Sequence, residues 1–220
     1  MGNRERIIEA SLELLNARGV RSVTTNHIAA HISISSGNLY YHFRNKEQII
    51  REIFPRIAAA ARSAIHFPEE GEITAAHVGR YHLAGIRSLW EYRFFFRDLT
   101  ELLSRDPTLA KDYRELQRWL IERLLSLFQR LVSQGHMNLR DFGDDIERVA
   151  TIAVILWTNW VNFLVTSRPQ PHLEPDDLAE GALHGFLAFA PYLTGQFVEE
   201  VRVVIQLLLL LPSMIFLKRA

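Results

Sequence analysis

Several features that mark other classes of protein are missing from this sequence. It has no cysteine, which excludes disulfides, thiolate metal sites and cysteine nucleophiles. The 25 lysine and arginine residues are balanced by 25 aspartate and glutamate residues. The formal net charge is therefore zero and does not by itself indicate a nucleic-acid partner. The opening residues MGNRERIIEA lack the apolar core of a signal peptide, which predicts a cytoplasmic location.

Recognisable catalytic and metal-binding motifs are missing too. The sequence has no glycine-rich phosphate loop and no serine elbow, and no histidines or carboxylates recur at metal-ligand spacing. His77 and His82 are five residues apart, so they do not share a helix face. We therefore expect no enzyme activity, no cofactor and no metal.

What the sequence does have is apolar residues at helical spacing. Hydrophobic residues make up 48% of its 220 residues, enough to bury a substantial core. From Leu109 to Leu131 they follow a 3.6-residue period, and similar stripes recur along most of the chain. The expected fold is therefore all-α.

The most informative stretch is residues 23–48, VTTNHIAAHISISSGNLYYHFRNKEQ. Its apolar spacing predicts a short helix, a tight turn, a second short helix and the start of a third, which is a helix-turn-helix. If Leu39 and Phe43 face inward, Gly37 and Tyr41 face outward. No acidic residue, which phosphates would repel, lies between Val23 and Lys46.

Amide, phenol and imidazole groups on the outward side of this second helix can bond phosphate oxygens or base edges. Asn45 is expected to cap the third helix, with Gln48 as the returning partner. Arg4 and Arg6 precede the stretch; they either reach DNA or remain solvated charges at a frayed end.

Together these residues resemble the amino-terminal DNA-binding domain of the TetR family of bacterial repressors, over roughly residues 4–51. The positions that carry the resemblance are Thr24, Thr25, Ile28, Ala29, Ala30, Ile34, Ser35, Gly37, Leu39, Tyr40, Tyr41, His42, Phe43, Lys46 and Glu47. Ser33 departs from the pattern, because such turns often carry glycine.

The resemblance implies three regions. Residues 1–50 form an amino-terminal three-helix helix-turn-helix domain, residues 51–195 a larger helical ligand-binding and dimerisation domain, and residues 196–220 an apolar carboxy-terminal helix or tail. The expected function is a TetR-like DNA-binding transcriptional regulator, a repressor released from a pseudo-palindromic operator by a small apolar or amphipathic ligand. The alternative is a lipid- or membrane-associated helical binding protein that retains a TetR-like head.

The resemblance also assigns residues to sites. Expected groove contacts are Thr25, Asn26, Gly37, Asn38, Tyr41 and His42, and expected phosphate contacts are Thr24, Ser36, Tyr40 and Lys46. A homodimer is expected through two late helices, at Trp157, Trp160, Val161, Leu164, Ala182, Gly185, Phe186 and Phe189.

Candidate ligand contacts come from the aromatic-rich middle of the chain, where most aromatic residues are ordinary core. They are His82, Trp90, Phe94, Arg97, Glu101, Trp119, Thr158, Asn159 and Asn162. Arg97 and Glu101 are also spaced for an ion pair within one helix. Asn159 and Asn162 face either a ligand or the dimer axis.

Helix boundaries follow from capping residues. Gly19 is expected to end a first helix over Asn3–Arg18, and Asp106-Pro107 to start a long one. Asp141 is a candidate cap for a helix over 142–166. Pro55 either kinks or breaks the helix that begins at Lys46.

The carboxy-terminal segment contains five consecutive leucines, Leu207 to Leu211. Arg202, Gln206 and Pro212 interrupt the apolar stretch, which is too short for a membrane span of about 20 residues. The segment is a helix packed on the body or across a dimer, a partly disordered end, or a membrane-surface contact. We expect no membrane contact for the protein as a whole.

Overall fold

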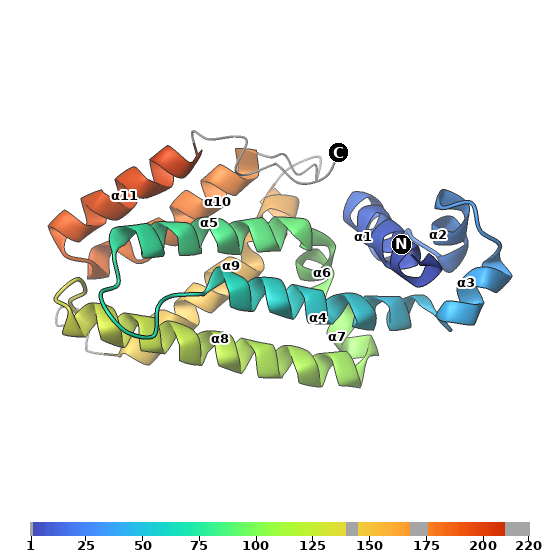
Figure 1. Cartoon of the computed structure of the whole chain (residues 1–220), viewed down its shortest axis with the longest axis horizontal. Coiled ribbons are helices and arrows are strands. Elements are labelled where there is room, and N and C mark those ends of the chain that lie inside the picture. The colour runs from blue at the N-terminus through green and yellow to red at the C-terminus, as the bar shows by residue number, and fades with distance from the viewer. Residues whose placement is uncertain (1, 140–144, 168–175, 210–220) are drawn as a thin grey trace. The chain divides into compact units, whose positions relative to one another are not determined.

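A computed structural model of the chain describes residues 2–139, 145–167 and 176–209 (Figure 1). Within these ranges there is no β-strand, and one isolated bridge joins Met137 and Leu193, so the predicted all-α fold is confirmed. The helices are α1 (Asn3–Arg18), α2 (Thr25–His31), α3 (Ser36–His42), α4 (Lys46–Ala64), α5 (Ala75–Glu91), α6 (Arg93–Arg97), α7 (Leu99–Arg105), α8 (Pro107–Ser133), α9 (Ile146–Ser167), α10 (Asp176–Leu187), the 3-10 helix η2 (Ala190–Tyr192) and α11 (Gly195–Leu209).

Two compact units make up the chain, and they do not follow the order of the sequence. Unit 1 comprises Met1–Ala59 and Tyr92–Arg114, and unit 2 comprises Ala60–Glu91 and Glu115–Ala220. Helices α6 and α7 therefore belong with the amino-terminal helices, a grouping that the expected boundary at residue 50 does not include. Helices α4 and α8 each pass from one unit into the other.

The first three helices of unit 1 pack as the sequence predicts. Helix α1 ends at Gly19, whose φ of 82° favours glycine. Leu39 and Phe43 are 0% and 1% exposed, and they anchor α3 from its inner side. Ser33, in the turn between α2 and α3, has a positive φ of 56°. The departure from glycine at Ser33 is therefore a real conformational cost, since a side chain disfavours that region.

Helix α4 begins with the predicted cap. Asn45 Oδ1 accepts a hydrogen bond from Gln48 N at 2.9 Å, and Gln48 Oε1 accepts one from Arg44 N at 2.8 Å. The helix then continues through Pro55 and does not break. Proline leaves the carbonyl of Arg51 without its usual helical donor, but both residues are exposed, so water can bond that carbonyl.

Polar contacts attach α6 to the end of α1 within unit 1. Asp98 Oδ2 accepts a hydrogen bond from Val20 N at 3.0 Å, and the Arg97 guanidinium donates to Leu15 O at 3.0 Å. A Cβ placed at Gly19 would lie only 3.0 Å from that guanidinium, so the bare glycine also leaves room for it. The turn after α1 is thus held by the middle of the sequence.

Glu101, on α7, makes two ion pairs in the same unit. Its carboxylate lies 2.6 Å from Arg21 and 2.9 Å from Arg105. The predicted ion pair between Arg97 and Glu101 is wrong. The helix ends at Arg97 and a new helix begins at Leu99, so Arg97 contacts Asp98 while Glu101 contacts Arg21.

The long helix α8 starts as predicted. Asp106 Oδ1 accepts hydrogen bonds from Thr108 N and Leu109 N, both at 3.1 Å. Helix α9 is capped by Asp145, whose Oδ1 accepts from Arg148 N at 3.0 Å. The predicted cap Asp141 lies outside the described residues.

Helix α5 is central in unit 2, where it lies against α9, α10 and α11 (Figure 1). At Gly79 of α5 an added Cβ would come within 2.4 Å of Val204, so the glycine permits a close approach of α11. Phe197, Val201 and Ile205 of α11 are buried. For residues 195–209, the helix packed on the body is therefore the arrangement observed; residues 210–220 lie outside the described part.

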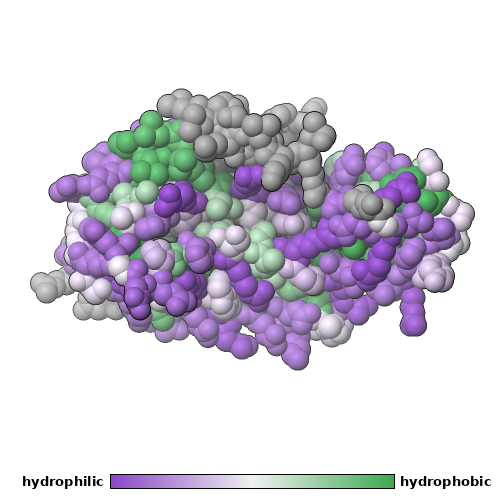
Figure 2. Space-filling model, in the orientation of Figure 1, coloured by the Kyte–Doolittle hydropathy of each residue, from purple (hydrophilic) through white to green (hydrophobic). Residues whose placement is uncertain are grey.

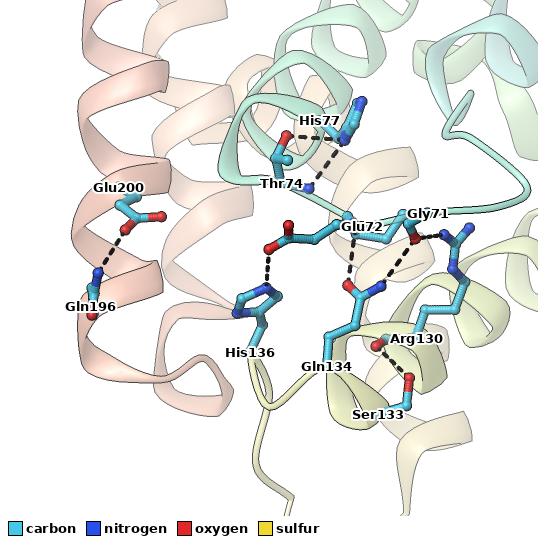
Figure 3. Close-up of polar contacts among 11 residues, drawn as sticks. Gly71, Glu72, Thr74, His77, Arg130, Ser133, Gln134, His136, Gln196 and Glu200 are labelled. Atoms are coloured by element: carbon cyan, nitrogen blue, oxygen red, sulfur yellow. Dashed lines mark hydrogen bonds and ion pairs between the residues drawn. The ribbon is translucent and has the colours of Figure 1, made fainter.

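A polar network ties the loop before α5 to the end of α8 (Figure 3). Gly71 O accepts hydrogen bonds from Arg130 at 2.7 Å and from Gln134 at 3.2 Å. His136 lies 3.4 Å from Glu72 in the same loop. These contacts hold the loop against the end of α8 and satisfy the carbonyl of Gly71.

Candidate nucleic-acid interface

The outward side of α3 is open to solvent, as predicted. Tyr41 is 85% exposed, which is exceptional for a large aromatic side chain, and Gly37, Asn38 and Tyr40 are exposed beside it. His42 is partly buried and forms an edge contact with Tyr41, with ring centroids 5.1 Å apart. This side of the helix therefore presents hydrogen-bonding groups that the fold does not use as core.

Side-chain pairs link α2 to α3 on the same surface. Thr25 Oγ1 lies 3.0 Å from the Tyr40 hydroxyl, and Ser36 Oγ donates to Asn26 Oδ1 at 2.9 Å. Thr24 caps α2, its side chain accepting from His27 N at 3.2 Å. Thr25 is partly buried and the other predicted contacts on α2 are exposed, so the structure brings the two sets of predicted DNA contacts onto one surface.

Lys46 has a second set of partners that the sequence did not reveal. Its Nζ donates to Val20 O at 2.5 Å and to Val23 O at 2.8 Å, in the turn that follows α1. Burial lowers the pKa of this ammonium below its ordinary value. Two of its three donors therefore hold the fold, and one remains for a phosphate.

The two early arginines lie in the first turn of α1 and have partners within unit 1, although Arg4 remains exposed to solvent. Arg4 pairs with Glu52 at 2.9 Å. Arg6 donates to Ile32 O at 3.0 Å, which braces the turn between α2 and α3, and to Asn3 Oδ1 at 3.1 Å. The sequence analysis left DNA contact open for both residues, and these contacts do not decide it.

Arg44 is a cation that the sequence analysis did not assign. It is exposed, directly before the start of α4, and its guanidinium has no ion-pair partner among residues 2–139, 145–167 and 176–209. Its position next to the capped helix start, in a segment without acidic residues, was the available signal.

The predicted ligand contacts fall into both units. Phe94, Arg97 and Glu101 belong to unit 1, where Phe94 is fully buried and the two charged side chains bond the end of α1. These three residues therefore have structural roles within unit 1.

The remaining ligand candidates belong to unit 2. His82 is buried, and Thr158 donates to Val154 O of its own helix at 2.8 Å. Asn159 is exposed and donates to Ile155 O at 2.9 Å. Trp90, Trp119 and Asn162 are partly buried. Of this group, His82 is the residue whose environment suggests a ligand contact.

The residues predicted at the dimer interface lie mainly inside unit 2. Those that are buried within the unit are Val161, Leu164, Ala182, Gly185, Phe186 and Phe189, and those that are partly buried are Trp157 and Trp160. They face the core because α9 and α10 pack against α5 on that side.

A different side of α9 is apolar and exposed. Its exposed large side chains are Ile152, Ile155, Leu156 and Phe163, which share one face at 100° per residue, and Leu187 is exposed on α10. By length and composition alone α9 is also apolar enough to cross a membrane, a test that core helices of soluble proteins pass as well. The exposed apolar face of α9 therefore consists of other residues than those predicted at the dimer interface.

Two family-level sequence profiles match the chain. One, described as "Bacterial regulatory proteins, tetR family", covers residues 7–53, and one described as "Bacterial transcriptional repressor" covers residues 57–201. The chain belongs to the TetR family of bacterial transcriptional regulators. Membership of the TetR family confirms the resemblance seen in residues 23–48, and it agrees with the expectation that the protein is not an enzyme.

Individual TetR-family proteins extend this comparison. A crystal structure of a TetR-family transcriptional regulator from Marinobacter aquaeolei VT8 is 37% identical with a TM-score of 0.81, covering 94% of this chain and 98% of that one. Tetracycline repressor protein class D from Escherichia coli is 32% identical over 91 residues, 41% of each chain. The HTH-type transcriptional regulator UidR from Escherichia coli K12 is 32% identical over 111 residues, 49% of this chain and 55% of that protein. The match to these curated relatives spans about half of their length or less.

Proposed function

We propose that this protein is a cytoplasmic, homodimeric repressor of transcription whose two α3 helices enter the major grooves of a pseudo-palindromic DNA operator. The observation that carries the proposal is the exposed side of α3, where Gly37, Asn38 and Tyr41 are open to solvent and Leu39 and Phe43 are buried beneath them; the Asn38 side chain accepts one exposed hydrogen bond, from Asn3 Nδ2 at 3.4 Å. A two-fold dimer would place two such helices about 34 to 36 Å apart or a multiple of that spacing.

The residues divide into two roles in this proposal. Asn38 reads bases, because an amide can pair with the edge of adenine in the major groove. Arg44 holds phosphate, because its guanidinium is exposed beside the start of α4, where backbone N–H groups also favour an anion. Lys46 adds its remaining donor, but its substitution would also disturb the turn that it holds.

The proposal is tested by selecting duplexes from a randomised pool with the full-length protein. Asn38→Ala should relax the preference at one base position of each half-site, by about 1 to 3 kcal/mol. Arg44→Ala should weaken binding to all sequences alike and reduce the slope of log affinity against log salt by about 1 per subunit. Arg80→Ala, an exposed arginine on α5, is the matched control and should change neither.

Two results would count against this function. One is that the protein selects no duplex at low salt. The other is that Asn38→Ala leaves both the affinity for DNA and the base preference unchanged. The first result removes DNA binding, and the second removes α3 from the groove.

The proposed dimer uses the exposed face of α9. Ile155, Leu156 and Phe163 on this face, with Leu187 of α10, form apolar surface of the kind that is buried at a homodimer interface. A small effector that binds the helical body would relieve repression if it favours a spacing of the two DNA-binding heads that does not fit the operator. Linkage then requires that DNA weaken effector binding by the same factor.

A further inference from the structure

His82, on α5, is a buried polar side chain with an unsatisfied ring nitrogen. The side chain is 1% exposed, and its Nδ1 has no hydrogen-bond partner among the residues that the structure describes. Buried polar atoms in folded proteins are nearly always hydrogen-bonded, so this exception calls for an explanation.

Aromatic rings from α5, α9, α10 and the turn after α10 surround His82. The centroids of Tyr81, Trp157, Phe189 and Phe186 lie 4.9, 5.9, 5.7 and 6.1 Å from that of the imidazole. Trp157 also stacks on Tyr81, with centroids 4.8 Å apart and 16° between the planes. Walls of this kind suit a flat apolar ring.

The indole of Trp157 rests on bare backbone. A Cβ added at Gly85 would lie 1.5 Å from a ring carbon of Trp157, and one added at Gly185 would lie 3.1 Å from its Nε1 and 3.5 Å from His82 Nδ1. Gly85 of α5 and Gly185 of α10 thus form the floor of a slot that the indole fills. Trp157 is only partly buried, which gives the ring a route to solvent.

A small cavity lies one turn further along α5 and α9. Its lining includes Ile86, Leu89, Trp160 and Val161, and its volume is about 10 Å³, roughly the room that one water molecule needs. This cavity is too small for an aromatic ring and Trp157 is not part of its lining, so a ring that binds beside His82 must displace a side chain there. Trp157 is the candidate, because it lies on glycines next to an unsatisfied polar atom.

No charged group in the described part of the chain affects the pKa of His82. Burial alone lowers the pKa of His82 to about 3, without a contribution from any charged neighbour. The imidazole is therefore neutral near pH 7. A charged guest would lose its hydration here without gaining a counterion, so a neutral molecule is favoured.

We propose that the slot between α5, α9 and α10 is an effector site for a neutral, planar aromatic molecule with a hydroxyl group, which replaces the Trp157 indole on Gly85 and Gly185 and bonds His82 Nδ1. A hydroxyl can both donate and accept, so it suits Nδ1 in either tautomer. The binding of such a molecule is inferred from the geometry of the slot. The effect of this binding on DNA affinity rests on the proposed function.

Three naphthalene derivatives test the site in the full-length protein by equilibrium dialysis near pH 7. The probe 2-naphthol carries the hydroxyl, 2-methylnaphthalene has a similar shape without it, and 2-naphthoate carries a negative charge. We expect 2-naphthol to bind roughly 5- to 10-fold more tightly than 2-methylnaphthalene, the range that one hydrogen bond supplies. Measurable binding of 2-naphthoate at comparable affinity would contradict the neutral site.

Two variants test separately the hydrogen bond to His82 and the displacement of the Trp157 ring. His82→Leu keeps a similar volume and should reduce the affinity for 2-naphthol to that for 2-methylnaphthalene, without changing the latter. Trp157→Ala should strengthen binding of both neutral probes about 10-fold or more, because no side chain must leave. Leu207→Ala, at an exposed apolar position on α11, is the control and should leave both affinities unchanged.

The outcomes distinguish this site from the proposed function. The site is overturned if the wild type binds both neutral probes equally, or if His82→Leu keeps the preference for 2-naphthol. DNA binding, measured without any probe, is independent of both results. A protein that binds 2-naphthol through His82 but selects no duplex would keep the site and lose the function as a regulator.

Discussion

At Gly37, in the first turn of α3, the chain carries a residue that the fold itself does not require. A Cβ there would meet only Ser35 Oγ, at 3.9 Å, and φ lies outside the left-handed region. Glycine in a helix costs about 0.5 to 1 kcal/mol relative to alanine. The proposed reason for keeping glycine is the close approach of the backbone to DNA.

Gly37→Ala should therefore raise stability and weaken DNA binding together. We expect the unfolding free energy in urea to rise by about 0.5 to 1 kcal/mol and operator affinity to fall, because the added methyl stands between α3 and the bases. Gly195→Ala, in the first turn of α11 and equally open, is the control and should leave operator affinity unchanged. Wild-type affinity in Gly37→Ala would show that the backbone does not come close to the duplex.

The buried imidazole of His82 should make stability depend on pH. Its pKa is about 3 in the folded protein and about 6.5 in the unfolded chain, so the unfolded chain takes up a proton first as the pH falls. The stability that comes from keeping the ring neutral is fully present above about pH 6.5. It is lost progressively as the pH falls toward 3. Between about pH 7 and pH 5 the unfolding free energy should fall by about 2 kcal/mol from this group.

Urea unfolding of the wild type and His82→Leu at both pH values measures this contribution. The variant should lack that part of the decrease, and at pH 7 it should be at least as stable, since it removes an unsatisfied buried nitrogen. His184→Leu, an exposed histidine on α10, should retain the wild-type decrease. An identical pH dependence in His82→Leu and the wild type would show that His82 is not buried as a neutral ring.

For single residues, the sequence predicted which side chains face solvent better than it predicted their hydrogen-bond partners. The outward side of α3 followed from the spacing of Leu39 and Phe43, because exposure in a short helix is set by neighbours three or four residues away. The bonds of Lys46 did not follow, because its acceptors, Val20 O and Val23 O, come close only when α1 and α4 pack.

At the scale of elements, the contact between α6 and α1 offers a paired test. Asp98→Ala removes the acceptor of Val20 N and should lower the unfolding free energy by about 1 to 2 kcal/mol, because that N–H is left unsatisfied. Arg21→Ala breaks an ion pair at an exposed side chain and should have little effect. Urea unfolding of both variants gives the comparison, and equal losses would contradict the role assigned to Asp98.

Helix starts were predictable where a side chain caps them. Asp106 and Asn45 are such caps, and both bond the backbone N–H groups that the sequence predicted. The break at Asp98 was missed because neither α6 nor α7 begins with a side-chain cap. Contacts with α1, far away in sequence, decide where that segment turns.

At the scale of the whole molecule, the exposed face of α9 predicts the oligomeric state. Phe163 is 57% exposed at this face, so Phe163→Glu should produce a monomer and abolish tight binding to a two-half-site operator. Figure 2 shows another apolar area over α11, where Leu207 is also 57% exposed. Leu207→Glu is thus a matched control that should remain dimeric.

Light scattering at micromolar concentration distinguishes the two variants. A dimer in Phe163→Glu, or a monomeric wild type, would remove α9 from the interface. The sequence alone did not distinguish Trp157 from Phe163, because both side chains are large and apolar. Only packing against α5 separates the core face from the free one.

The discontinuity of unit 1 limits how this regulator can be engineered. A chimera that grafts residues 1–50 onto the body of another family member would transplant Val20 and Arg21 but leave Asp98 and Glu101 behind. The hybrid would then need replacement acceptors in the recipient. A transferable DNA-binding unit should carry residues 92–114 together with residues 1–59. The donor protein then supplies both partners of the Val20–Asp98 and Arg21–Glu101 contacts.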